Sequence, residues 1–344
     1  MAPDSLAAAL TATTAAVLAA VLLAITWDRG SGVRRAAQRS ATGVLCLATA
    51  LAATGICINR QVDTVTTWSA LAGQDTTTPG DATAAADTGG HSGGHMFTFT
   101  VTGAASGLTL PVRAYLPAAY HQQPTARFPV IEALHGFPGS PASWVNRLAA
   151  AHHLDQEIAA GRMAPTVVLF PPQTPDALLD TECTDLTHGP KAETFLTVDV
   201  PAAAEARLRV RTDRAGWGLI GYSAGGYCAT NLALRHPDRY TTAASLSGYA
   251  DPGITIGDGT EHTLNDDAWR LHHLPQPAVA LYLSSGLADR RAHHDAETLR
   301  RLAHAPLDVT TSYVDGGGHS MAVWEAAEGP AFDWLSSWLG RPVT

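Results

Sequence analysis

Short apolar runs, each bounded by Gly, Pro or Asp, alternate with helical patterns over most of this chain. The first two runs alternate apolar and polar residues, whereas the later ones are apolar almost throughout. In order they are MFTFTVTG, LTLPVRAYLP, FPVIEALHG, PTVVLFPP, GWGLIGYS, TTAASLSGY, AVALYLSSG and DVTTSYVDG. Helical patterns fall at residues 141–160, 195–209, 224–235, 290–304 and 320–339. Apolar strands separated by helices predict an α/β fold, with about eight strands in a mostly parallel sheet and helices on both faces.

The composition supports a large folded core and argues against nucleic acid as a partner. Of the 344 residues, 46% are hydrophobic and 15% are charged, which suits one large domain with additional segments. The net charge is -9 and Lys191 is the single lysine, so the chain lacks the basic face that a phosphate backbone requires. No H-E-x-x-H, phosphate-binding loop or dinucleotide fingerprint occurs, and we therefore expect no metal ion and no cofactor.

Two apolar stretches without charge, residues 6–27 and 41–58, precede the alternating part of the chain. Each is close to the roughly 20 residues that a helix needs to cross a bilayer. The segment between them carries four arginines and the tail MAPDS carries no Lys or Arg, so the positive-inside rule places that segment in the cytoplasm and both chain ends outside. No basic residue precedes the first stretch, which disfavours a cleaved signal peptide. Two alternatives stay open, a buried helix in place of one stretch or a signal peptide in place of the second, and in both the main domain is exported.

The segment that follows the apolar stretches is rich in Thr, Ala, Gly and Asp, a composition typical of a flexible tether. We therefore expect a transmembrane hairpin over residues 1–60, a linker over 61–95 and a main domain over 96–344. His91 and His95 of the linker could together ligate a metal, but we expect them to be solvated because a third ligand is lacking.

The peptide Gly221-Tyr222-Ser223-Ala224-Gly225 fits the pattern G-x-S-x-G and lies between a predicted strand and a predicted helix. In such an elbow the serine takes a strained backbone conformation, and the residues two before and two after it must be small for the chain to turn so tightly. Gly221 and Gly225 meet that requirement, which favours Ser223 as an exposed nucleophile. The pattern alone is common, and the competing interpretation is a glycine-rich turn whose serine only caps the helix.

A histidine and an aspartate that could act together with this serine follow later strands. His319 comes after three glycines that end the last predicted strand, so its imidazole could take the proton of Ser223. A carboxylate after an earlier strand could hold the histidine in the correct tautomer. Asp289 is the preferred candidate, and Asp251 and Asp295 remain alternatives. The resulting order of Ser, Asp and His along the chain is that of the α/β-hydrolases.

Attack of a serine on a carbonyl creates an oxyanion, which two fixed backbone N–H donors stabilise best. We expect one donor to be the N–H of Ala224, directly after the nucleophile, and the other to be the N–H of Phe137, in the loop after the third predicted strand. His135 in the same loop could itself be catalytic. We expect it to shape the loop instead, because His319 is better placed to act as the base.

The four cysteines fall into two pairs. Cys46 and Cys57 lie in the second apolar stretch, whereas Cys183 and Cys228 lie in the exported domain, where an oxidising compartment permits bonding. A Cys183–Cys228 disulfide would attach the loop after the fourth predicted strand to the helix behind Ser223. The alternative is a pair of unbonded, buried cysteines.

Six motifs in this order, HGFPGS, DTECTD, ETFLTVDVPAA, GYSAGGYCA, RHPDRY and GGHSMAVW, resemble actinobacterial members of the esterase D and mycolyltransferase-like branch of the α/β-hydrolases. The resemblance covers about residues 97–340 and implies an α/β-hydrolase fold with serine hydrolase or acyltransferase activity. The site residues that it implies are an acyl-carrying Ser223, a base at His319, an acid near Asp289 and an oxyanion hole formed by Phe137 and Ala224.

The chain departs from this branch directly after the histidine. Many relatives have Ser or Thr and then Trp there, whereas this chain has Ser320 and Met321, with Trp324 further on. The difference concerns the wall of the acyl pocket and leaves the expected chemistry unchanged.

These features predict a membrane-anchored serine esterase whose catalytic domain lies outside the cytoplasm, with lipid or glycolipid esters of the envelope as substrates. Transfer of acyl chains between envelope glycolipids would use the same residues, and a catalytically silent exported domain that binds a partner or a sugar is the alternative from another class. Residues 251–275 form a long connection after the sixth predicted strand, where a lid over such a site is often inserted.

Overall fold

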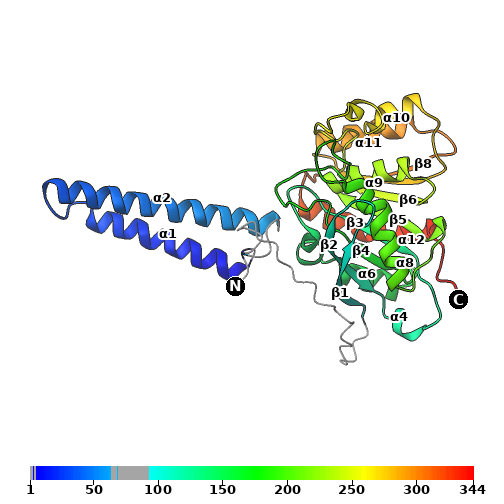
Figure 1. The fold of residues 1–344 in the computed structure, drawn as a ribbon, viewed down its shortest axis with the longest axis horizontal. Coiled ribbons are helices and arrows are strands. Elements are labelled where there is room, and N and C mark those ends of the chain that lie inside the picture. Colours follow the sequence, from blue (N-terminus) through cyan, green and yellow to red (C-terminus); the bar gives the residue numbers. More distant parts are fainter. Residues whose placement is uncertain (1–2, 4, 63–67, 69–92) are drawn as a thin grey trace. The chain divides into compact units, whose positions relative to one another are not determined.

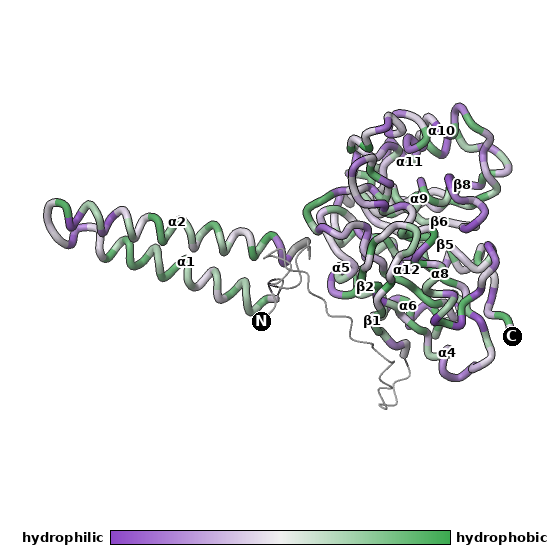
Figure 2. Tube along the Cα trace, viewed as in Figure 1, coloured by the Kyte–Doolittle hydropathy of each residue, from purple (hydrophilic) through white to green (hydrophobic). Residues whose placement is uncertain are grey.

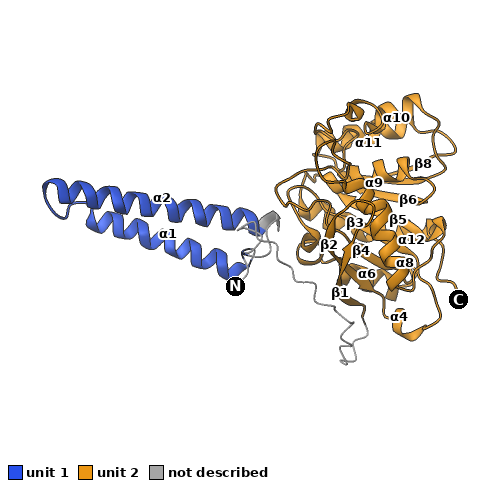
Figure 3. Cartoon of the chain, in the orientation of Figure 1, with its two compact units in different colours: residues 1–78 blue, residues 79–344 orange. Residues whose placement is uncertain are grey.

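The computed structural model describes residues 3, 5–62, 68 and 93–344. The chain divides into two compact units, residues 1–78 and residues 79–344 (Figure 3). Most of the expected linker at 61–95, including His91, lies outside the described residues. His95 is described and begins the first strand of the second unit.

The first unit contains two long helices, α1 (Leu6–Thr26) and α2 (Gly32–Val62), which pack against each other. Figure 2 shows apolar residues along both helices. Helix α1 and the segment Gly32–Arg60 of α2 are long and apolar enough to cross a membrane, as judged by length and composition. In the basic segment between the two apolar stretches, Arg35 forms an ion pair with Asp28.

An eight-stranded sheet forms the centre of the second unit (Figure 1). Its strands are β1 (His95–Thr102), β2 (Thr109–Leu116), β3 (Val130–Leu134), β4 (Val167–Phe170), β5 (Trp217–Tyr222), β6 (Thr242–Leu246), β7 (Ala280–Gly286) and β8 (Asp308–Val314). Their order across the sheet is β1-β2-β4-β3-β5-β6-β7-β8. Strand β2 runs antiparallel to β1 and β4, and the other neighbouring pairs are parallel. The predicted mostly parallel sheet is therefore confirmed, with one strand for each apolar run.

Helices cover both faces of the sheet. In chain order they are α4 (Ala119–Gln122), α5 (Pro141–Asn146), α6 (Ala150–Ala159), α7 (Ala192–Thr194), the π-helical turn η1 (Phe195–Asp199), α8 (Val200–Arg207), the 3-10 turn η2 (Arg214–Gly216), α9 (Ala224–Arg235), the 3-10 turn η3 (Thr260–His262), α10 (Asp267–His273), α11 (Arg290–Leu302) and α12 (Met321–Trp338). Helices α8, α9, α10 and α11 contribute to one buried cluster with strand residues such as Leu219. Helices α5, α6 and α12 contribute to a second cluster with strand residues such as Ile220. Burial on both faces explains why the central strands are apolar at nearly every position.

Three predicted segments differ in detail from the structure. The helix expected over 141–160 is two helices, α5 and α6, because Ala149 between them has φ 52° and interrupts the helical path. The helix expected over 195–209 begins earlier, as α7, and passes through the turn η1. Residues 251–275 are structured rather than a loose connection, since they contain η3 and α10, and the buried Asp267 of α10 accepts a hydrogen bond from Asn231 of α9 at 2.9 Å.

The packing of α12 on the sheet predicts unequal effects of two substitutions in this helix. Phe332 is fully buried, whereas Trp338 is 43% exposed. Phe332→Ala removes a buried ring and leaves a cavity, so we expect the free energy of unfolding to fall by roughly 3–5 kcal/mol. Trp338→Ala is the matched control, with an expected change of about 1 kcal/mol or less. Urea unfolding of the purified protein, followed by tryptophan fluorescence, measures both values, and equal losses would contradict this placement of α12.

Candidate active site

Ser223 lies at the sharp turn between β5 and α9. The strand ends at Tyr222 and the helix begins at Ala224, so the serine is the single residue between them. Its backbone has φ 55° and ψ -124°, a conformation that residues other than glycine rarely adopt. The Ser223 N–H donates to the Leu246 carbonyl of β6 at 2.9 Å, and its carbonyl accepts from the Gly226 N–H at 2.9 Å. These two hydrogen bonds hold the strained turn in place.

The glycines on either side of the turn are required by close backbone contact. A Cβ on Gly221 would lie 1.8 Å from the carbonyl oxygen of Gly225. A Cβ on Gly225 would lie 2.2 Å from the carbonyl oxygen of Leu134 at the end of β3. Neither space can hold a side chain, because such distances are far shorter than any van der Waals contact. The small residues that the G-x-S-x-G pattern demands therefore have a direct steric reason here.

The side chains of Ser223, His319 and Asp289 form a continuous hydrogen-bonded chain. Ser223 Oγ lies 2.9 Å from His319 Nε2, and His319 Nδ1 lies 2.6 Å from Asp289 Oδ2. Asp289 and Ser223 are buried, whereas a third of the His319 side chain is exposed. A neutral imidazole that donates from Nδ1 to the carboxylate can accept the serine proton at Nε2. The arrangement can therefore activate a serine hydroxyl for attack on a carbonyl.

Close contact between two loops brings Asp289 to His319. A Cβ on Gly286, at the end of β7, would lie 2.0 Å from the Gly317 carbonyl oxygen in the loop after β8. The Ala288 N–H donates to that same oxygen at 2.9 Å. Because β7 and β8 are parallel neighbours, the loops that follow them leave the sheet at the same edge. The two glycines let the loops touch, and the carboxylate meets the imidazole beside this contact.

The two other aspartates considered from the sequence have different partners. Asp251 lies 3.4 Å from the guanidinium group of Arg291. Asp295 lies 3.9 Å from the same guanidinium group. Of the three carboxylates, Asp289 is the one that contacts His319. The geometry thus favours Asp289 as the partner of the histidine.

The two backbone segments that carry the expected oxyanion donors adjoin Ser223. Ala224 is the first residue of α9, where helical N–H groups have no acceptor within the helix. Phe137 follows Gly136, and a Cβ on Gly136 would lie only 3.1 Å from the Ser223 Cβ. Both backbone segments are therefore next to the serine, as a pair of oxyanion donors requires.

His135 lies in the same loop and is fully enclosed by protein. Its Nδ1 lies 2.8 Å from the Gly136 carbonyl oxygen, and Gln173 Nε2 donates to the His135 carbonyl at 2.8 Å. Burial lowers the pKa of His135 to about 4, although the hydrogen bond with Gly136 raises it. The imidazole is therefore neutral at ordinary pH. These contacts fit the expected role of His135 in shaping the loop.

Two aromatic rings contact the His319 imidazole. Trp324 of α12 meets it edge-on, with ring centroids 5.0 Å apart, and stacks on Tyr222 at 4.7 Å. Tyr249 lies nearly parallel to the imidazole, with centroids 5.8 Å apart and 14° between the ring planes. Sequence reasoning singles out Trp324 but not Tyr249. The signal for Tyr249 is its place shortly after β6, at the carboxyl edge of the sheet, where reactive groups collect.

A disulfide joins Cys183 to Cys228, with their Cα atoms 5.6 Å apart. It attaches the loop after β4 to α9, the helix that begins next to Ser223. Cys46 and Cys57 of α2 are free thiols. The covalent bond therefore restrains the helix that directly follows Ser223.

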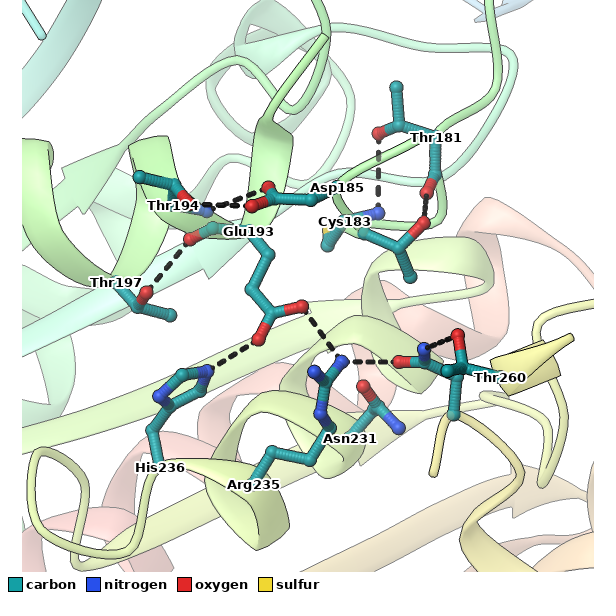
Figure 4. Close-up of polar contacts among 12 residues, drawn as sticks. Thr181, Cys183, Asp185, Glu193, Thr194, Thr197, Asn231, Arg235, His236 and Thr260 are labelled. Carbon is teal, nitrogen blue, oxygen red and sulfur yellow. Dashed lines mark hydrogen bonds and ion pairs between the residues drawn. The ribbon is translucent and has the colours of Figure 1, made fainter. Parts of the chain in front are cut away.

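Polar contacts strengthen the same attachment (Figure 4). Near the disulfide, Asp185 accepts the Thr194 N–H at 3.0 Å. Glu193 accepts a hydrogen bond from Arg235 Nη1 at 2.7 Å and lies 2.7 Å from His236 Nε2. Arg235 and His236 lie at the carboxyl end of α9, so the helix is held at this end by charged groups and near its start by the disulfide.

A metal site is not evident in the part of the chain that the structure describes. No group of three or more His, Cys, Asp or Glu side chains there is arranged to hold a metal ion. His91, one member of the pair considered from the sequence, lies outside that part, and His95 stacks on Phe97 with ring centroids 6.4 Å apart.

The family to which this fold and site belong is established by comparison with known proteins. Residues 104–334 match the model of the family described as "Putative esterase". The chain belongs to the Esterase family. The resemblance that the six motifs imply, and the α/β-hydrolase fold that goes with it, are therefore confirmed.

Two relatives of this Esterase family member match part of its length. An uncharacterized protein of Corynebacterium glutamicum is 28% identical over 247 residues, which are 67% of this chain and 58% of that protein. The diacylglycerol acyltransferase/mycolyltransferase Ag85B of Mycobacterium avium is 28% identical over 158 residues, which are 38% of this chain and 47% of that protein. The chain thus spans about half of the length of these relatives.

Solved structures of three proteins share the fold. A ferulic acid esterase has a TM-score of 0.63 at 20% identity, covering 72% of this chain and 100% of its own. The S-formylglutathione hydrolase of Agrobacterium tumefaciens has a TM-score of 0.61 at 16% identity, covering 73% and 98%. MPT51 of Mycobacterium tuberculosis has a TM-score of 0.56 at 18% identity, covering 72% and 99%. At these identities the likeness concerns the fold alone.

The disulfide predicts a definite number of reactive thiols. In the denatured but unreduced protein we expect alkylation at Cys46 and Cys57 only, and after reduction at all four cysteines. Intact-mass spectrometry counts the added groups, and four additions before reduction would contradict the bond.

Because the bond links residues 45 positions apart, the double variant Cys183→Ser/Cys228→Ser should lose roughly 2–4 kcal/mol of unfolding free energy.

Proposed function

We propose that this protein is a membrane-anchored serine carboxylic-ester hydrolase that acts outside the cytoplasm through an acyl-enzyme on Ser223. The observation that carries the proposal is the hydrogen-bonded chain from Ser223 through His319 to Asp289 at the carboxyl edge of the sheet. Membership in the Esterase family supports the reaction class.

In the first half of the reaction, His319 Nε2 takes the proton of Ser223 as the serine oxygen attacks the ester carbonyl. Asp289 stabilises the imidazolium and keeps Nε2 directed at the serine. The oxyanion accepts hydrogen bonds from the backbone N–H groups of Phe137 and Ala224. The tetrahedral intermediate then collapses, the C–O bond to the alcohol breaks, and the alcohol oxygen takes the proton from Nε2.

In the second half of the reaction, a water molecule repeats these steps in reverse. His319 removes a proton from the water as its oxygen attacks the acyl carbonyl on Ser223. Collapse of the second tetrahedral intermediate returns the proton to the serine oxygen and releases the carboxylic acid. Each proton and electron pair in the cycle is supplied by the ester, water and these side chains, so the reaction requires no cofactor.

Acyl transfer is a second candidate, favoured by the similarity to the mycolyltransferase Ag85B of Mycobacterium avium. A hydroxyl of an acceptor, such as an envelope glycolipid, would replace water in the second half of the reaction. Hydrolysis and transfer use the same side chains. The two are distinguished by whether a trehalose-like acceptor diverts the acyl group from free acid to a new ester.

The N-terminal helices support the membrane part of the proposal. Helix α1 and the segment Gly32–Arg60 have the length and composition of bilayer spans, and basic residues lie between the two apolar stretches. We propose residues 1–60 as the anchor, 61–95 as the linker and 96–344 as the catalytic domain. The disulfide of that domain suits an oxidising compartment.

Labelling with a fluorophosphonate tests the nucleophile, and the kcat of ester hydrolysis tests the acid. We expect the intact protein to be labelled and Ser223→Ala not to be, because the serine oxygen is the group that reacts. Asp289→Asn should retain the fold and lower kcat on the order of 10³–10⁴-fold, because the amide holds the histidine in the wrong tautomer. Asp258→Asn is the matched control, since Asp258 is exposed and its carboxylate accepts hydrogen bonds from Thr260 of its own turn. Absence of labelling in the intact protein would favour a silent binding domain.

Reporter fusions test the orientation of the anchor. We expect alkaline phosphatase to be active when fused after Thr344 and inactive when fused after Gln38, because it folds only outside the cytoplasm. The basic segment around Gln38 should stay in the cytoplasm under the positive-inside rule. The reverse pattern, or activity at neither site, would contradict the proposed topology.

A further inference from the structure

We infer that the Tyr249 hydroxyl hydrogen-bonds to the alcohol oxygen of the ester as that oxygen leaves. The inference rests on the proposed function, because it assigns one more residue to the same reaction. Tyr249 Oη lies 3.2 Å from His319 Nε2, the nitrogen that also lies 2.9 Å from Ser223 Oγ. The hydroxyl of Tyr249 therefore borders the nitrogen through which the proton moves.

The position of Nε2 determines where the alcohol oxygen must lie. During acylation the imidazolium gives its Nε2 proton to the departing oxygen, and during deacylation Nε2 takes a proton from the attacking oxygen. In each step, the oxygen that takes or gives the proton lies within about 3 Å of Nε2. Tyr249 Oη lies at a similar distance from the same nitrogen. The phenol and the departing alcohol oxygen therefore lie around the same nitrogen during acylation, close enough for the O–H to be turned toward that oxygen.

The phenol of Tyr249 is a hydrogen-bond donor at neutral pH. Burial raises its pKa above the ordinary value of 10.0 more than the hydrogen bond with Ser223 lowers it. Without substrate, the O–H can donate to the single lone pair of Nε2, where it competes with Ser223. With an ester in place, the O–H can turn to the alcohol oxygen, on which negative charge develops as the C–O bond breaks.

The surroundings of Tyr249 hold its ring in one place. The guanidinium carbon of Arg291 lies 4.2 Å from the centroid of the ring. Arg291 in turn lies 3.4 Å from the Asp251 carboxylate. The backbone is fixed as well, because the Ala250 N–H donates to Asp295 at 3.3 Å. Two aspartates that do not contact the histidine thus help to position the tyrosine.

The proposed hydrogen bond leaves the balance of the reaction unchanged. The C–O bond breaks, its electron pair stays on the alcohol oxygen, and the proton on His319 Nε2 moves to that oxygen. Tyr249 keeps its own proton and stabilises the developing charge. The stabilisation is greatest for a basic alkoxide and small for p-nitrophenolate, which delocalises its charge into the ring.

The test compares two esters of one acid, ethyl butyrate and p-nitrophenyl butyrate, on the wild-type protein and Tyr249→Phe. This variant keeps the ring contacts with Arg291 and His319 and removes only the hydroxyl. We expect kcat/KM for ethyl butyrate to fall about tenfold or more and that for p-nitrophenyl butyrate to change little. Because kcat/KM reports acylation for both esters, the comparison isolates the departure of the alcohol.

Tyr120→Phe is the matched control, since it removes a hydroxyl that accepts the Arg209 N–H away from this site. It should leave the ratio of the two kcat/KM values unchanged. An equal loss for both esters with Tyr249→Phe would overturn the inference, and so would an equal gain, which would show that the phenol only obstructs Ser223. Ser223→Ala distinguishes failure of the inference from failure of the proposed function. If Ser223→Ala still hydrolyses the esters, the proposed function fails. If Ser223→Ala is inactive, a negative result with Tyr249→Phe concerns the inference alone.

Discussion

The reversal of the backbone at Ser223 is the constraint on which the site depends. A residue other than glycine at φ 55° is stable only when its surroundings fix it, and here they do so by backbone contact with β3 and β6. The close approach of Gly221 to Gly225 leaves no room for a side chain at either of these two positions. The same turn starts α9, so the Ala224 N–H directly follows the serine in the chain.

A second close approach, between Gly286 and Gly317, assembles the partners of the serine. Strand β8 is three strand positions from β5, a separation of roughly 14 Å at the usual spacing of strands. His319 reaches Ser223 across this distance because the loop after β8 turns back over the edge of the sheet. Contact with the loop after β7 places Asp289 beside Nδ1 of His319. The rings of Trp324 and Tyr249 limit how the imidazole can rotate.

Some charged groups around the site contact His319, and others support Tyr249 or the helix α9. Asp251 and Asp295 lie near Arg291, which rests on the ring of Tyr249, whereas Asp289 alone of the three contacts the imidazole. The disulfide near the start of α9 and the ion pair of Glu193 with Arg235 at its carboxyl end restrain that helix. Ser223, His319 and Asp289 therefore lie on or beside segments that are restrained by a disulfide, by ion pairs and by backbone contact.

The sequence by itself determined the sheet, its covering helices and the elbow, because these follow from local patterns: apolar runs, helical periodicity and glycines around Ser223. It favoured Asp289 but left Asp251 and Asp295 open and did not single out Tyr249, because all three aspartates follow strands that end at one edge of the sheet. Only the tertiary structure decided these points. The contact of Gly286 with Gly317 is made between residues far apart in the chain, and hydrogen-bond partners at such contacts depend on distances that local patterns do not carry.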